Sequence, residues 1–368
     1  MQTDNISQLA GFLRGELADL IDVRETVIGP RRISFLGKLL VSPDLAIPAM
    51  EGRLAGHGYI PLIRSFNGGV EVRIVSKPRA AGKKPNIGVN IALLAATVLT
   101  TLVAGASLAH GGGFLSGLFL IISRPALILE GIPFSFTLLS ILVIHELGHY
   151  FASMYHGVRS TLPYFIPAPT FLGTLGAVIK TRSVIPDRKS LIDIGASGPI
   201  AGFVIAVPAF IIGVRLSEFG YMPHSGGLQF GDSIVVKALI YVFKGAGPEG
   251  AELFLHPVAF AAWIGLFITM LNLLPAGQLD GGHICYALFG RGHFYLARGT
   301  VAVLVVLSLY NREAGMIWMV WAILIMIIGL DHGPPVNDIT PLGTGRKVLG
   351  AVAIAIFVLC FVPVPFRW

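Results

Sequence analysis

Long apolar segments without charged residues are the feature that most constrains this chain. Of its 368 residues, 54% are hydrophobic and only 13% are charged, whereas a soluble domain averages roughly 25% charged residues. Several segments approach the length of about 20 residues that a helix needs to cross a bilayer. The sequence therefore predicts a polytopic α-helical membrane protein. The net charge of +7 is modest, and we expect no nucleic-acid partner.

We expect about seven membrane spans, within a range of six to eight. They lie near 88–109, 133–155, 191–213, 256–274, 297–311, 315–330 and 347–365. Segment 113–129 is also apolar, but Arg124 and Pro125 interrupt it, so we interpret it as half-inserted or interfacial. The segments that lie on the same side of the membrane as the N-terminal domain carry most of the Lys and Arg residues. This bias predicts a cytoplasmic N-terminus.

Residues 1–84 differ from the rest and predict a small α+β soluble domain that ends in a basic linker. Helices are expected at 5–22 and at 42–56, the second with Ser42 as N-cap and Pro43 in its first turn. Strands are expected at 59–64 and 70–75, joined by an Asn-Gly turn. The N-terminus lacks the apolar core of a signal peptide, so we expect no cleavable leader.

Segment 161–182 is apolar but interrupted by three prolines and two glycines, Gly173 and Gly176, and residues 174–181 have β-like character. Non-helical backbone at membrane depth survives only where protein or a water-filled cavity covers it. The pattern therefore predicts a re-entrant hairpin beside an internal site.

The sequence His145-Glu146-Leu-Gly-His149 lies within the predicted span 133–155. Residues four apart lie on one face of a helix, so both imidazoles can reach one metal ion. Glu146 can touch a water bound to that ion without being a ligand. Ionisable residues inside an apolar segment are costly and indicate a functional site. Zinc suits two imidazoles, a carboxylate and one open position.

The best candidate for the third ligand is Asp280, which follows the span 256–274 in the sequence MLNLLPAGQLDGGH. Asn272 and Pro275 would end that helix, and the glycines after Asp280 allow close approach of the chain. With the predicted topology, both motifs lie at the cytoplasmic ends of their spans and can meet.

These two motifs resemble those of the site-2 protease family of intramembrane zinc metalloproteases. HELGH matches the family's HExxH motif, and NLLPAGQLDGG is most similar to the branch with the chloroplast EGY-type proteins. The resemblance covers about residues 130–290, which we expect to be the catalytic core. It divides the chain into a soluble domain with its linker, 1–84, and a membrane domain, 85–368, whose C-terminal spans occupy 297–365.

The resemblance implies a role for each motif residue. His145, His149 and Asp280 would bind one zinc ion, with Glu146 as general base. Asn272 would hydrogen-bond the substrate or the developing oxyanion. Gly173 and Gly176 would belong to a substrate-binding strand, and SGPIAG at 197–202 would allow close helix packing. Five further histidines are interpreted as loop or interfacial residues: His156, His224, His256, His293 and His332. His283 is interpreted as interfacial, with a supporting role beside the metal ligands as the alternative.

The implied function is zinc-dependent hydrolysis of peptide bonds in transmembrane helical proteins, with the active site toward the cytoplasm. One alternative is a multispan metal-binding transporter or a catalytically silent relative. The intact Glu146 argues against silence, and a transporter should show inverted repeats. Another alternative is the class of membrane HExxH proteases that acts on prenylated C-termini. In that class the third metal ligand is a Glu. The sequence specifies no oligomeric state.

Overall fold

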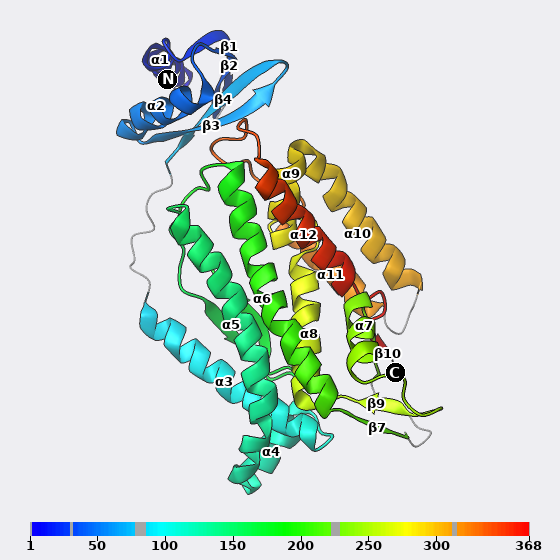
Figure 1. Ribbon diagram of the computed structural model, residues 1–368. Coiled ribbons are helices and arrows are strands. Elements are labelled where there is room, and N and C mark those ends of the chain that lie inside the picture. The colour runs from blue at the N-terminus through cyan, green and yellow to red at the C-terminus, as the bar shows by residue number, and fades with distance from the viewer. Residues whose placement is uncertain (1, 30–31, 78–85, 222–228, 311–314, 368) are drawn as a thin grey trace.

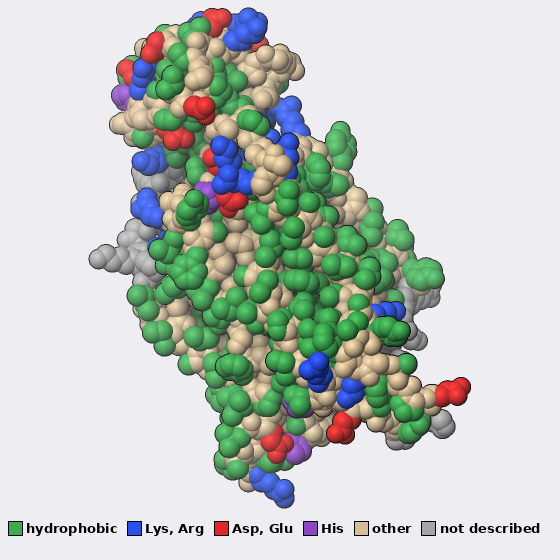
Figure 2. All heavy atoms as spheres, in the orientation of Figure 1, with side chains coloured by type: hydrophobic (Ala, Val, Ile, Leu, Met, Phe, Trp, Pro, Cys, Tyr) green, Lys and Arg blue, Asp and Glu red, His purple; other side chains and the backbone are tan. Residues whose placement is uncertain are grey.

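The computed structural model describes residues 2–29, 32–77, 86–221, 229–310 and 315–367. A small domain with a β-sheet stands at one end of a larger, mostly helical part (Figure 1). Hydrophobic side chains cover the middle of the helical part in the view of Figure 2, and charged side chains gather toward its two ends. That distribution is typical of a protein whose middle lies in lipid.

The N-terminal domain is built from two helices and one antiparallel sheet. Its elements are α1 (Gln2–Glu16), β1 (Ile21–Gly29), β2 (Arg32–Leu39), α2 (Pro43–Gly56), β3 (Tyr59–Phe66) and β4 (Gly69–Ser76). The strand order is β1-β2-β4-β3, so β3 forms one edge of the sheet. Both helices and all four strands contribute to a hydrophobic core around Phe35 and Met50.

Several sequence predictions for this domain are confirmed and one is wrong in part. Helix α2 begins at Pro43 as expected, although the Ser42 side chain makes no capping hydrogen bond. The β3–β4 hairpin turns at Asn67 and Gly68, whose positive φ angles suit an Asn-Gly turn. The helix expected at 5–22 ends at Glu16, and the sequence continues into β1, which we did not predict. The linker lies mostly outside the described residues.

The membrane domain follows. Its helices are α3 (Ile87–Ala109), α4 (Phe114–Ser123), η1 (Pro125–Gly131), α5 (Ile132–Tyr155), α6 (Arg188–Leu216), α7 (Ile234–Phe243), α8 (Pro257–Asn272), α9 (Asp280–Phe289), η2 (Gly290–Gly292), α10 (His293–Tyr310), α11 (Met316–Ile328) and α12 (Thr344–Cys360). Its strands are short: β5 (Tyr164–Pro167), β6 (Thr174–Val178), β7 (Glu218–Gly220), β8 (Gln229–Phe230), β9 (Glu252–Phe254) and β10 (Phe366–Arg367). Each of the seven predicted spans overlaps one helix, although span 347–365 extends five residues past the end of α12 at Cys360.

Among the described residues, four helical stretches are long and apolar enough to cross a membrane. They are Ile87–Ala109, Pro125–Tyr155, Arg188–Leu216 and Asp280–Tyr310. Helices α8 and α11 are apolar but shorter, so the count of seven remains a prediction. Segment 113–129 splits into α4 and η1 at Arg124 and Pro125, the interruption noted in the sequence.

Strands β5 and β6 form the hairpin predicted within 161–182. The hairpin contacts α3 and lies beside α5. Gly173 turns the chain into β6 with a φ of 75°. Its carbonyl oxygen accepts a hydrogen bond from the Thr100 hydroxyl of α3, at 2.6 Å. Backbone that is not helical is thus held against protein, as burial in a membrane requires.

Small residues let the helices approach closely around the centre of this domain. A Cβ added to Gly105 of α3 would lie 2.9 Å from the Cα of Gly131 and 2.9 Å from the Cβ of Phe134. A Cβ added to Gly148 of α5 would lie 2.7 Å from the carbonyl oxygen of Ser197 on α6. Such contacts replace the hydrophobic effect as the source of helix association in lipid.

The variant Gly105→Ala should therefore destabilise the membrane domain. The added methyl group meets backbone atoms that cannot turn away, and overpacking of this kind costs about 1–3 kcal/mol. We expect a lower midpoint of thermal unfolding in detergent. Gly299→Ala in α10 is the matched control, because no atom lies within 4 Å of its added Cβ. Equal midpoints for the two variants would contradict this packing.

Candidate metal centre

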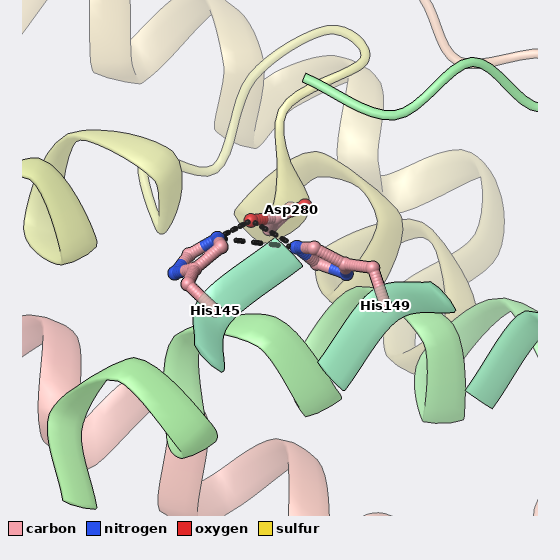
Figure 3. A group of neighbouring side chains, drawn as sticks. All are labelled: His145, His149 and Asp280. Carbon is pink, nitrogen blue, oxygen red and sulfur yellow. Dashed lines mark hydrogen bonds and ion pairs between the residues drawn. The ribbon is translucent and has the colours of Figure 1, made fainter. Parts of the chain in front are cut away.

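Three side chains from two distant segments meet at one point. His145 and His149 lie one turn apart on α5, and Asp280 is the first residue of α9 (Figure 3). The two Nε2 atoms are 3.2 Å apart. The Oδ2 atom of Asp280 lies 3.4 Å from Nε2 of His145 and 3.2 Å from Nε2 of His149. The structure thus brings together the three residues predicted as metal ligands.

These separations fit a tetrahedral zinc ion. With zinc–ligand distances of about 2.0–2.1 Å, two ligand atoms on one ion lie about 3.3 Å apart. All three observed separations fall within about 0.1 Å of that value. Both imidazoles are buried, whereas the Asp280 side chain keeps 16% exposure. Of the three side chains, Asp280 is therefore the most accessible.

Helix α6 packs against both imidazole rings and holds them with their Nε2 atoms toward each other. The Nδ1–H of His149 donates to the carbonyl oxygen of Ile194, at 2.7 Å, which leaves Nε2 as the unprotonated nitrogen. Two glycines of the SGPIAG segment face the rings. A Cβ on Gly198 would overlap the His149 ring, and a Cβ on Gly202 would lie 3.1 Å from Nδ1 of His145. The predicted close packing therefore takes place directly against the ligands.

Glu146 and Asn272 also lie at this site. The Glu146 side chain is buried, and its carboxylate is within hydrogen-bonding reach of the backbone of Ile179, one residue beyond β6. The side-chain nitrogen of Asn272, the last residue of α8, lies 3.3 Å from Nε2 of His145. Both predicted catalytic residues are thus next to the metal ligands.

The two glycines of the hairpin have different surroundings. Gly173 packs against the backbone of α3, where an added Cβ would meet Thr101 Cα at 2.6 Å. Gly176 has a φ of 99° and no atom within 4 Å of an added Cβ. Gly176 therefore leaves open space beside β6, whereas Gly173 shapes the turn that precedes it.

Some residues near the site were missed by sequence reasoning. His283 and His332, interpreted as interfacial residues, form a hydrogen bond of 2.6 Å between Nδ1 and Nε2. His156 is also paired, with Asp193 at 2.8 Å. His224 lies outside the described residues. The partners of these histidines are 37 and 49 residues away in the chain, so no local pattern indicates them.

Comparison with known proteins agrees with this geometry. The model of peptidase family M50 matches residues 133–309, which include all three ligand residues. This part of the chain, slightly less than half of it, is similar to peptidase family M50. It is 33% identical over 239 residues to the probable chloroplastic zinc metalloprotease EGY1 of Arabidopsis thaliana, covering 63% of this chain and 43% of that protein.

Other EGY proteins match over the same extent. The probable chloroplastic zinc metalloprotease EGY2 of Arabidopsis thaliana is 29% identical over 253 residues, which is 66% of this chain and 43% of that protein. EGY1 of Oryza sativa subsp. japonica is 29% identical over 248 residues, which is 64% of this chain and 41% of that protein. The chain thus spans less than half the length of these relatives. These similarities are to the EGY branch, the branch that the sequence of the second motif resembles.

The variant Gly198→Ala should weaken metal binding without removing any ligand. Its methyl group would displace the His149 ring, and disturbing the surroundings of a ligand typically costs 10–100-fold in metal affinity. Zinc affinity measured by competition with a chelator checks this. Gly345→Ala in α12, with no atom within 4 Å of its added Cβ, should leave the affinity unchanged. Wild-type affinity in Gly198→Ala would show that α6 does not set the orientation of the ring.

Proposed function

We propose that this chain is an intramembrane zinc metalloprotease that hydrolyses peptide bonds of transmembrane proteins. The observation that carries the proposal is the spacing of the three ligand atoms, with a carboxylate one residue after the first ligand. The similarity to peptidase family M50 and to probable zinc metalloproteases supports the same chemistry. His145, His149 and Asp280 would hold one zinc ion per chain.

A bound zinc ion supplies Lewis acidity, which lowers the pKa of a water molecule toward ~7. Glu146 would take the proton of that water through its carboxylate oxygen and later give it to the leaving amine. Its position suits this role, because Glu146 directly follows the first proposed ligand and its buried carboxylate lies beside the ligand group. Proton transfer by a positioned group contributes typically 10²–10⁴-fold to the rate.

Asn272 would stabilise the negative charge that develops on the scissile carbonyl oxygen. Its side-chain amide is a donor located at the edge of the ligand group, 3.3 Å from a ligand nitrogen. A single donor of this kind is worth about 3 kcal/mol of barrier. We assign to Asn272 this role together with substrate orientation.

Strand β6 is the proposed binding edge for an extended substrate. It pairs with β5 on one side only, and its Leu175 and Val178 are exposed. An added strand would form main-chain hydrogen bonds there and would lie next to Ile179 and the Glu146 carboxylate. Gly176 provides space for close approach, and Gly173 provides the turn that sets the direction of β6.

A transmembrane helix must unwind before it can bind in this way, because its carbonyl groups are engaged in helix hydrogen bonds. Substrates with proline or several small residues near the cleaved bond would unwind at lower cost. The proposed partners are therefore helical membrane proteins within the bilayer. We place the site on the side of the N-terminal domain, which the distribution of Lys and Arg predicts to be the cytoplasm.

The pair Glu146→Gln and Asp280→Asn separates catalysis from metal binding. Glu146→Gln should keep one zinc ion per chain and lose at least about 100-fold in cleavage of a model transmembrane substrate, because the proton acceptor is gone. Asp280→Asn should lose zinc, because the carboxylate ligand is replaced by a weaker neutral one. Metal analysis and a cleavage assay in proteoliposomes measure both quantities.

Full cleavage by the Glu146→Gln protein would refute the assignment of the general base. If the wild-type protein binds zinc but cleaves none of several transmembrane substrates, the result would favour a transporter or a catalytically silent relative. Retention of zinc by Asp280→Asn at wild-type affinity would show that another residue is the third ligand.

A further inference from the structure

A short segment after α11 joins the N-terminal domain to the membrane domain. We call residues 332–339 the bridging segment. It lies between the N-terminal sheet and the ends of the helices (Figure 1). The N–H of Ile63, on edge strand β3, donates to the carbonyl oxygen of Val336 at 2.7 Å. The N–H of Asp338 donates to the carbonyl oxygen of Ile63 at 2.9 Å.

The opposite edge of the bridging segment pairs with the membrane domain. The N–H of Val336 donates to the carbonyl oxygen of Ile185 at 3.0 Å, and the N–H of Asn337 donates to that of Pro186 at 2.8 Å. Asn337 therefore forms parallel bridges on both sides, to Ile63 and to Asp187. The side chain of Ile339 packs against the core of the N-terminal domain. The bridging segment is thus an added strand that both domains share.

Side chains of the bridging segment also contact α9, the helix that begins with the metal-site residue Asp280. The Tyr286 hydroxyl donates to Oδ2 of Asp338 at 3.0 Å. The His332 ring stacks on the Tyr286 ring at 4.7 Å and hydrogen-bonds to His283. Burial lowers the pKa of His332 to about 3, which favours its neutral imidazole in the hydrogen bond with His283.

The position of Asp280 depends on how α9 is held. Tyr286 is six residues beyond Asp280, or about 9 Å along a helix. A helix of this length moves as a rigid unit, so a shift at Tyr286 displaces the Asp280 carboxylate. The separations among the three ligand atoms leave room for only a few tenths of an ångström.

We propose that Tyr286 and His332 are positioning residues, through which the N-terminal domain fixes α9 and with it the Asp280 carboxylate. The expected effect on kcat rests on the proposed function. The expected effect on zinc affinity does not require the chain to be a protease. The N-terminal domain is then part of the metal-binding unit, because its edge strand holds the bridging segment that holds α9.

The first test compares Tyr286→Phe with Tyr295→Phe, whose side chain is on α10 and 77% exposed. Tyr286→Phe removes only the hydroxyl group that reaches Asp338. We expect about tenfold weaker zinc affinity and a comparable fall in kcat with KM unchanged, whereas Tyr295→Phe should match wild type. A purely structural role would lower the unfolding temperature but leave the zinc affinity of the folded protein unchanged, and that result would overturn the proposal.

The second test weakens the link at the N-terminal domain, far from the metal. Ile63→Pro removes the N–H that binds Val336, together with a side chain buried in the core of the N-terminal domain. Ile63→Ala, which shortens that side chain but keeps the N–H, is therefore the matched control. We expect Ile63→Pro to lower zinc affinity about as much as Tyr286→Phe, with no further loss in the double variant, and to accelerate hydrogen exchange in 280–289. Unchanged exchange and zinc affinity in Ile63→Pro would refute the link.

These readouts keep the two proposals separate. If the wild-type protein cleaves but Tyr286→Phe binds zinc and cleaves normally, the positioning role fails and the proposed function stands. If the wild-type protein does not cleave but Tyr286→Phe and Ile63→Pro weaken zinc binding as expected, the proposed function fails and the positioning role stands.

Discussion

The meeting of two imidazoles and one carboxylate at a single point is the constraint on which the rest of the structure depends. Asp280 and His149 are 131 residues apart in sequence, yet their ligand atoms lie 3.2 Å apart. Helix α5 supplies the spacing of the two histidines, and α6 packs against their rings through glycines. The break after α8 then returns the chain so that α9 begins at the site. An ionisable group of this kind is stable at membrane depth only when its members share a partner.

The lipid environment explains why the hairpin is covered by protein and why the helices approach each other at glycines. Backbone that is not helical must be covered by protein, and the β5–β6 hairpin meets this condition by packing on α3. Close helix contacts rely on glycine, as at Gly105 and Gly148, because apolar side chains gain nothing from leaving lipid for protein. The proposed substrate edge and the candidate metal ligands are therefore placed by the same packing that holds the helices together.

Local patterns predicted the elements whose cause is local. Pro43 marked the start of α2, Asn67 and Gly68 marked a hairpin, and the HExxH spacing indicated two candidate ligands that the structure brings together. Gly281 and Gly282 allow the close approach predicted for them, because a side chain at Gly281 would overlap the carbonyl oxygen of Leu273. Local patterns do not indicate elements that long-range packing decides. The bridging segment had no sequence signal, since it acquires its strand-like pairing only between two domains.

The most direct test of the account is zinc K-edge X-ray absorption of the wild-type protein in membranes or detergent. The account predicts one zinc ion per chain with two imidazole ligands at about 2.0–2.1 Å, oxygen ligands at about 2.0–2.2 Å, and no sulfur. In Asp280→Asn the bound zinc, and with it the absorption signal, should be lost. A sulfur ligand, or a third imidazole in place of the carboxylate, would contradict the central claim.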